Sequence, residues 1–273
     1  MNFTIASATV LATIAFLAGC SSAPQRFDRR AQAAELVKIR AESGPFPTLI
    51  YMKAASNRPA GDDRPLLVLL EGDGAPWRNG MEPSIDPTTR NPIALELLLR
   101  SPPPAAYVTR PCYHGLLVDK CTAEHWTGAR YSAEIVASMT AAVREAQRRS
   151  GAKSVTLIGY SGGGVLAVLI AERLEDVASV ITLGANIDTA AWTQHHGYLP
   201  LSQSLNPALS DHEHRWPELH LQGASDTVVP TATTKAYFVR YPSARRQVIE
   251  GYDHVCCWVR DWETLFPTLI KER

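Results

Sequence analysis

The sequence predicts an α/β fold in which helices flank a mostly parallel central sheet. From Thr48 onward, compact apolar runs alternate with longer segments of helical periodicity, which is the pattern of βα units wound around one sheet. Of the 273 residues, 45% are hydrophobic and 20% are charged, so the chain can bury the core of one large domain and is not disordered. We expect that domain to cover residues 45–273.

Six apolar runs are the expected strands and four longer segments are the expected helices. The strands are Leu66–Leu70, Tyr107–Thr109, Val155–Ile158, Val180–Leu183, Leu219–Leu221 and Gln247–Ile249. The helices are Ser132–Arg149, Gly163–Leu174, Thr231–Tyr241 and Cys257–Ile270. Residues 72–104 and 186–217 are long connections rich in Pro, Trp, His and Asn. Because long loops in compact domains commonly bind ligands or cover sites, we expect these two to form lids or pocket walls.

The strongest motif is Gly159-Tyr160-Ser161-Gly162-Gly163-Gly164, directly after one expected strand and before one expected helix. This G-x-S-x-G pattern in a strand–turn–helix setting predicts a tight turn that exposes the hydroxyl of Ser161 as a nucleophile. The amide of Gly162, at the start of the helix, would then face an oxyanion formed on the substrate. The alternative is a glycine-rich turn with an incidental serine.

A nucleophilic serine needs a base and an orienting acid, in the chain order serine, acid, histidine. Asp226 follows the expected strand Leu219–Leu221 and a glycine turn, and His254 follows the last expected strand. Asp188 and Asp253 compete for the role of the acid. We favour Asp226, because its strand, turn and following proline fit best.

These motifs together resemble the α/β-hydrolase superfamily, in particular its small esterase-like and dienelactone-hydrolase-like members, over residues 48–270. The resemblance implies a serine hydrolase without a cofactor, in which Ser161 is acylated, His254 is the base and Asp226 orients it. It also implies a second oxyanion donor after the strand Leu66–Leu70, where many relatives have His-Gly. Here the backbone amide of Gly72 or Asp73 takes that place, unless Asp73 is a plain loop residue.

An ester is the default substrate, because its leaving group needs the least help. A cell-envelope acyltransferase and a non-catalytic, membrane-anchored binding protein are the alternatives. The chain contains 27 basic and 27 acidic residues, so no strong electrostatic field indicates a nucleic-acid partner. We expect no metal, although His195, His196, His212 and His214 form a loose cluster in the sequence. No feature of the sequence indicates the oligomeric state.

The first residues predict export. The nearly uninterrupted apolar run from Ile5 to Ala18 is short for a membrane span and is typical of a signal peptide over residues 1–19. Leu17-Ala18-Gly19-Cys20 resembles a bacterial lipobox, which implies lipidation of Cys20. The polar and charged residues that follow, with alanine interspersed, suit a lipidated tether with a short amphipathic helix over residues 20–44. Residues 2–16 contain no Lys or Arg, unlike most signals, so an ordinary secretory signal or short anchor is the alternative. Ser21 favours the outer membrane, facing the periplasm.

Export allows disulfides, because the periplasm is oxidising. Cys112 and Cys121 flank a short loop and are expected to pair. Cys256 and Cys257 are adjacent, and for them we expect free or buried thiols, since a bond between neighbours requires an unusual peptide geometry.

Overall fold

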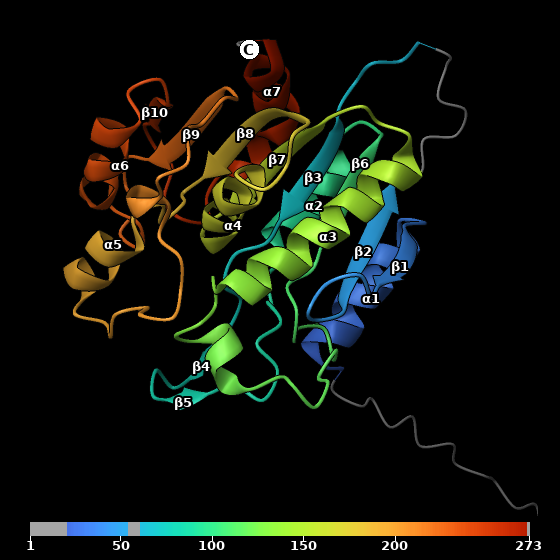
Figure 1. Cartoon of the computed structure of the whole chain (residues 1–273), viewed down its shortest axis with the longest axis horizontal. Coiled ribbons are helices and arrows are strands. Elements are labelled where there is room, and N and C mark those ends of the chain that lie inside the picture. The colour runs from blue at the N-terminus through green and yellow to red at the C-terminus, as the bar shows by residue number, and fades with distance from the viewer. Residues whose placement is uncertain (1–20, 54–60, 272–273) are drawn as a thin grey trace, which may run out of the picture.

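A computed structural model describes residues 21–53 and 61–271 (Figure 1). Its centre is an eight-stranded sheet in the order β1-β2-β6-β3-β7-β8-β9-β10. The bounds are β1 Val37–Ala41, β2 Thr48–Lys53, β3 Leu66–Leu70, β6 Ala105–Val108, β7 Val155–Tyr160, β8 Val177–Leu183, β9 Glu218–Gly223 and β10 Arg245–Ile249. Only β1 and β2 run antiparallel to their neighbours, so the sheet is mostly parallel, as predicted.

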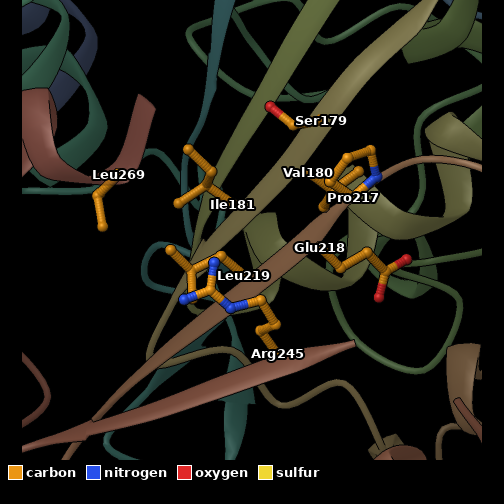
Figure 2. Close-up of a pocket in the computed structure, with 8 residues that line it drawn as sticks. All are labelled: Ser179, Val180, Ile181, Pro217, Glu218, Leu219, Arg245 and Leu269. Atoms are coloured by element: carbon orange, nitrogen blue, oxygen red, sulfur yellow. The ribbon is translucent and has the colours of Figure 1, made fainter. Parts of the chain in front are cut away.

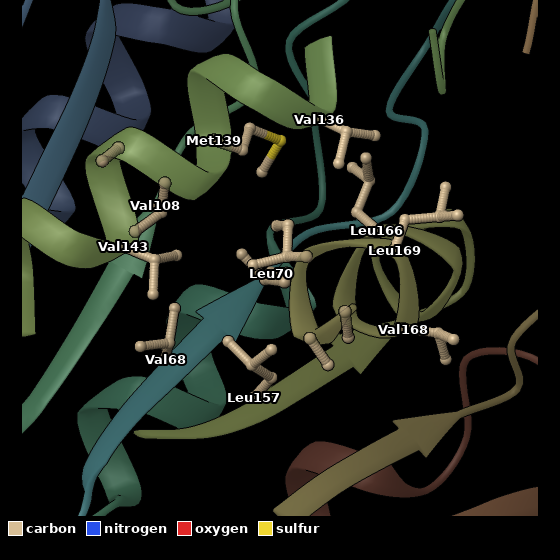
Figure 3. Close-up of a cluster of buried hydrophobic side chains, with 14 of the residues drawn as sticks. Val68, Leu70, Val108, Val136, Met139, Val143, Leu157, Leu166, Val168 and Leu169 are labelled. Carbon is tan, nitrogen blue, oxygen red and sulfur yellow. The ribbon is translucent and has the colours of Figure 1, made fainter. Parts of the chain in front are cut away.

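Helices cover both faces of this sheet. The longer ones are α1 Ala23–Ala33, α2 Ile93–Arg100, α3 Ala133–Ser150, α4 Gly162–Ala171, α5 Thr189–His196, α6 Lys235–Arg240 and α7 Trp258–Lys271, with 3₁₀ turns at Ala123–Trp126, Pro207–Leu209 and Thr231–Thr234. Successive side chains of β3 point to opposite faces. Val68 and Leu70 therefore pack with α3 and α4 (Figure 3), whereas Leu67 and Leu69 pack with α1, α2 and α7. Burial on both sides explains why β3 is continuously apolar.

All six predicted strands are present, most of them a few residues longer than expected. The four predicted helices are also present, although the segment 231–241 divides into a 3₁₀ turn and the short helix α6. The edge strand β1 and its neighbour β2 were not among the predicted strands. They form because β1 pairs along its whole length with β2, with Ile39 opposite Ile50.

The expected tether over residues 20–44 is wrong for the part that the structure describes. The short helix is present as α1, with Ser22 as its N-cap, but it is packed into the domain. Phe27 is buried against Tyr51 and Tyr107, and β1 belongs to the central sheet. The folded domain therefore begins near residue 22 rather than at residue 45.

The two long connections carry structure of their own. Residues 72–104 contain the hairpin strands β4 Trp77–Arg78 and β5 Glu82–Pro83, followed by α2. Residues 186–217 contain α5 and the 3₁₀ turn Pro207–Leu209. Figure 1 shows β4, β5 and α5 at the end of the molecule toward which the parallel strands point.

The structure pairs Cys112 with Cys121, whose Cα atoms are 5.6 Å apart, as expected. It also pairs Cys256 with Cys257, so the expectation of free or buried thiols there is wrong. The peptide bond between these two residues is cis and their Cα atoms are 3.0 Å apart, which is the arrangement that lets neighbouring sulfurs meet. The predicted signal segment and Cys20 lie outside the described residues. Within residues 21–53 and 61–271, no helix combines the length and the hydrophobicity that a membrane span needs.

Candidate active site

Ser161 occupies a sharp turn between β7 and α4. Its backbone has φ 52° and ψ −126°, a left-handed conformation that costs energy for a residue with a side chain. The turn also needs glycines, because a Cβ on Gly159 would overlap the backbone of Gly163. Sequence and structure therefore agree on a strained turn that leaves Ser161 partly exposed at the carboxyl end of β7.

The structure brings His254 and Asp226 to Ser161. The Nε2 atom of His254 lies 3.0 Å from the Ser161 Oγ, and its Nδ1 atom lies 2.8 Å from the Asp226 Oδ2. Asp226 is fixed in turn, since its Oδ1 accepts hydrogen bonds from the amides of Val228 and Val229 at 2.9 and 2.7 Å. The three side chains form a continuous hydrogen-bonded chain in the order that a serine nucleophile requires.

Neither competing aspartate reaches the histidine ring. Asp188 caps α5, where its Oδ1 accepts from the amide of Ala191 at 3.1 Å. Asp253 holds its own turn by accepting from the amides of Val255 and Cys256 at 2.8 and 2.6 Å. This turn carries His254, so Asp253 supports the position of the histidine through the backbone.

The expected oxyanion donors lie beside the serine. Gly162 is the first residue of α4, so its amide has no partner one turn earlier in the helix. Gly72 packs on Ser161, because a Cβ on Gly72 would lie 3.2 Å from the Ser161 Cβ. However, the Gly72 amide donates to the Glu71 Oε1 at 3.2 Å, and it is therefore engaged. Asp73 is left as the better candidate for the second donor.

The side chain of Asp73 is the centre of a buried ion cluster that sequence reasoning missed. Its Oδ1 accepts from Arg110 at 2.7 Å, its Oδ2 accepts from Arg130 at 2.8 Å, and the Tyr131 hydroxyl donates to both oxygens at 2.8 and 2.9 Å. Burial opposes ionisation of Asp73, but the two guanidinium groups outweigh it and hold the pKa of this carboxyl below its ordinary value. The residue is therefore a structural anion and not a solvated loop residue.

Glu71, immediately before this turn, is buried behind the site. Burial raises the pKa of its carboxyl to about 8, so the group is largely neutral at pH 7. Its two oxygens accept from the amides of Gly72 and Ala94, which ties the turn to the start of α2. With Glu71 neutral, two guanidinium groups face one carboxylate, and the cluster carries a net positive charge.

The loop histidines separate in space. His196, at the end of α5, has its Nε2 2.8 Å from the carbonyl oxygen of Val228, whereas His214 is buried between Glu172 and Glu218. Across the part of the chain that the structure describes, no three His, Cys, Asp or Glu side chains are grouped as a metal site would require.

A small pocket lies away from this site. Figure 2 shows it between β8 and the start of β9, lined among others by Ile181, Leu219 and Arg245. Its volume of ≈ 30 Å³ is room for about one water molecule. It opens near the amino-terminal ends of β9 and β10, whereas Ser161 follows the carboxyl end of β7. None of Ser161, Asp226 and His254 lines it.

The fold and the hydrogen-bonded serine, histidine and aspartate define the class of the α/β-hydrolases. A family model described as serine hydrolase (FSH1) matches residues 118–255, and the chain belongs to that family. The match includes Ser161, Asp226 and His254. No curated protein matches the chain.

Solved structures share the fold. Est1E from Butyrivibrio proteoclasticus superposes with a TM-score of 0.58 at 14% identity, over 86% of this chain and 98% of that chain. An esterase from Pyrococcus furiosus gives 0.61 at 14% identity, over 87% and 90%. An acylaminoacyl peptidase from Pyrococcus horikoshii gives 0.58 at 11% identity, over 86% of this chain and 40% of its own. At such identities the likeness extends to the fold alone.

Proposed function

We propose that this serine hydrolase cleaves carboxylic esters through an acyl-enzyme on Ser161. The observation that carries the proposal is the hydrogen-bonded chain from Ser161 Oγ through His254 to Asp226, at 3.0 and 2.8 Å. Those contacts are within the range in which one imidazole can take a proton from a hydroxyl while a carboxylate fixes its tautomer.

In the proposed reaction, His254 accepts the Ser161 proton as the hydroxyl oxygen attacks the ester carbonyl. The amides of Gly162 and Asp73 donate to the oxyanion, and the positive charge of the neighbouring arginine cluster stabilises it further. Collapse of the intermediate expels the alcohol, which takes the proton from His254. Water then attacks the acyl-enzyme and gives a proton to His254. Collapse breaks the bond between the acyl carbon and the Ser161 Oγ, which takes that proton back from His254 as the carboxylic acid leaves.

A fluorophosphonate probe tests the nucleophile directly. We expect an adduct on Ser161, located by mass spectrometry, that is absent in Ser161→Ala and retained in Ser225→Ala. Ser225 is a matched control, because it is exposed and adjoins Asp226. The same three proteins are then assayed on esters of graded acyl length and on matched amides. An intact, folded protein that forms no adduct would overturn the proposal.

We further propose that the mature chain is lipidated on Cys20 and faces the periplasm from the outer membrane. The support is the apolar run Ile5–Ala18, whose end is part of the segment Leu17-Ala18-Gly19-Cys20. Metabolic labelling with a radioactive fatty acid should mark the wild-type protein and not Cys20→Ser. Equal labelling of the two, or none of either, would refute lipidation at this residue.

A further inference from the structure

Large apolar side chains are exposed on two segments beside the candidate active site. On the β4–β5 hairpin and its continuation, Trp77, Met81 and Ile85 are 39%, 80% and 73% exposed. On the loop closed by the Cys112–Cys121 disulfide, Leu117 is 46% exposed. We call these four residues the apolar rim. Grouped exposed apolar side chains are uncommon on soluble surfaces and commonly mark a contact with another apolar phase.

The two segments of the rim are joined by hydrogen bonds. The Asp86 Oδ2 accepts from the amide of Gly115 at 3.0 Å, and the Thr88 Oγ1 accepts from the amide of His114 at 2.6 Å. These bonds fix the backbone next to Ile85 against the backbone two residues before Leu117. The two segments that carry the rim are therefore held together and do not move as independent loops.

This surface borders the mouth of the site. The hairpin follows Asp73 after three residues, and the amide of Ala75 donates to the carbonyl oxygen of Pro87 at 2.8 Å. From the disulfide-closed loop, the Tyr113 hydroxyl donates to the carbonyl oxygen of Asp73 at 2.9 Å. Both segments of the rim are thus bonded to the turn that holds the proposed oxyanion donor.

The described chain also begins at this end of the molecule. Phe27 in the second turn of α1 packs on His114, with ring centroids 4.4 Å apart, so α1 starts beside the disulfide-closed loop. Figure 1 shows the start of α1 and the β4–β5 hairpin at the same end of the molecule. The sequence before α1 contains the apolar run Ile5–Ala18 and Cys20. A membrane that held this segment would lie close to the rim.

We propose that the apolar rim docks on the phospholipid bilayer that holds the N-terminus, so that the mouth of the site faces the membrane. Trp77 has the amphipathic ring that suits a membrane–water interface, and Met81 and Ile85 supply the apolar surface that would enter it. The hairpin charges Arg78 and Glu82 balance each other, because the two side chains form an ion pair at 2.8 Å. Resting on the proposed function, the substrate class is then an ester presented at the bilayer surface.

Trp77 provides the test. The full chain is bound to phosphatidylethanolamine–phosphatidylglycerol vesicles whose acyl chains carry bromine, which quenches tryptophan at short range. We expect quenching of the wild type that falls several-fold in Trp77→Phe and is unchanged in Trp216→Phe. Trp216 is the control, because it lies before β9, at the amino-terminal end of the parallel strands, with its Nε1 bonded to the Glu218 Oε1 at 2.9 Å. If the wild type is not quenched, or if both variants are quenched equally, the proposal is overturned. Crosslinking gives an independent check: a crosslink between the hairpins of two copies, or between the hairpin and the N-terminal segment, would also overturn it.

A second arm separates docking from catalysis. Met81→Ser with Ile85→Ser should lower turnover of a vesicle-embedded ester several-fold and leave turnover of a soluble short-chain ester unchanged. Val37→Ser with Val239→Ser is the matched control, because these residues are 50% and 82% exposed and lie outside the rim, on β1 and α6. An equal loss on both esters contradicts docking. If the wild type cleaves neither ester, the proposed function fails, and the quenching result still decides whether the rim docks.

Discussion

The Asp73 side chain packs directly on the backbone of Gly162. A Cβ at position 162 would overlap the Asp73 Oδ1 and crowd the Tyr131 hydroxyl. The amides of Asp73 and Gly162 are the two proposed oxyanion donors, so the side chain of one donor residue fixes its distance from the other. Because arginine and tyrosine side chains hold Asp73 in place, the buried cluster sets the distance between the two donor amides.

Gly162→Ala tests this contact. The added methyl group must push Asp73 aside, and we expect kcat for ester hydrolysis to fall about 10²–10³-fold, the usual effect of losing one oxyanion donor. Gly128→Ala is the control, since a Cβ there meets no atom within 4 Å. Comparable turnover by the two variants would show that the contact does not position the donors.

Asp73→Asn tests the charge of the cluster. Removal of the carboxylate leaves Arg110 and Arg130, whose side chains are 3% and 7% exposed, without their anion. Breaking a buried ion pair on one side typically costs about 3–5 kcal/mol, and we expect a loss of that size in the free energy of unfolding measured by urea titration. The exposed Asp119→Asn should change it little. An unaltered midpoint for Asp73→Asn would show that the carboxylate charge is not needed to hold the two arginines in the folded protein.

Much of the fold and the core of the site could be predicted from local sequence. The strands before Ser161 and Asp226 are short apolar runs that end in turn residues, and the glycines around Ser161 are required by the turn itself. Each of these patterns lies within about ten consecutive residues, so it can be recognised without knowledge of the tertiary contacts.

The remaining features depend on partners far apart in the chain. Arg110 and Arg130 meet Asp73 across 37 and 57 residues, and an isolated arginine gives no signal of its partner. β1 becomes an edge strand only because β2 is there to pair with it. Gly184, whose left-handed backbone lies against Asp226 and His254, was also missed. The sequence offers one indication of this position, which is that a glycine directly follows an expected strand.

Stability should fall at alkaline pH because of His214. Burial alone would lower its pKa, but hydrogen bonds to Glu172 and Glu218 outweigh burial and raise the pKa from 6.5 to about 9. Protonation therefore stabilises the folded state fully below pH 6.5, and this contribution is lost as the pH rises through 9. We expect the free energy of unfolding to drop by about 1–2 kcal/mol between pH 6.5 and 9.5, measured by urea titration.

The matched variant is His214→Gln, which cannot be charged. Its stability should be lower than that of the wild type at pH 6.5, and this difference should shrink by about 1–2 kcal/mol by pH 9.5, because the titration of Glu71 is common to both proteins. A wild-type curve that stays flat over this range, or a variant with the same slope as the wild type, would argue against a protonated His214.

The two disulfides should differ in their effect on stability. The Cys112–Cys121 bond spans a sequence separation of 9, and restricting a loop of that size in the unfolded chain stabilises the fold by about 2–3 kcal/mol. Cys256–Cys257 joins neighbours and closes no loop. Urea titration should therefore show that loss for Cys112→Ala with Cys121→Ala, and a much smaller one for Cys256→Ala with Cys257→Ala. Equal losses would count against the chain-entropy explanation.

Replacing Asp226 should reduce catalysis far more than replacing either competing aspartate. In Asp226→Asn the amide oxygen can keep the bonds to Val228 and Val229, while the amide nitrogen faces the His254 Nδ1. An N–H group there favours the tautomer whose Nε2 carries the proton, and that tautomer cannot accept the Ser161 proton. We expect kcat to fall about 10³–10⁴-fold, as for the equivalent change in other serine hydrolases, with little change in urea midpoint.

Asp188→Asn and Asp253→Asn are the comparison, since the first loses only charge at the start of α5 and the second retains an acceptor for its own turn. Both should keep kcat within about ten-fold of the wild type, because neither side chain contacts the imidazole. A larger loss in Asp188→Asn than in Asp226→Asn would indicate that Asp188, which follows β8, is the acid of the triad. The proposed role of Asp226 in orienting His254 would then be wrong, whatever the distances in the resting site.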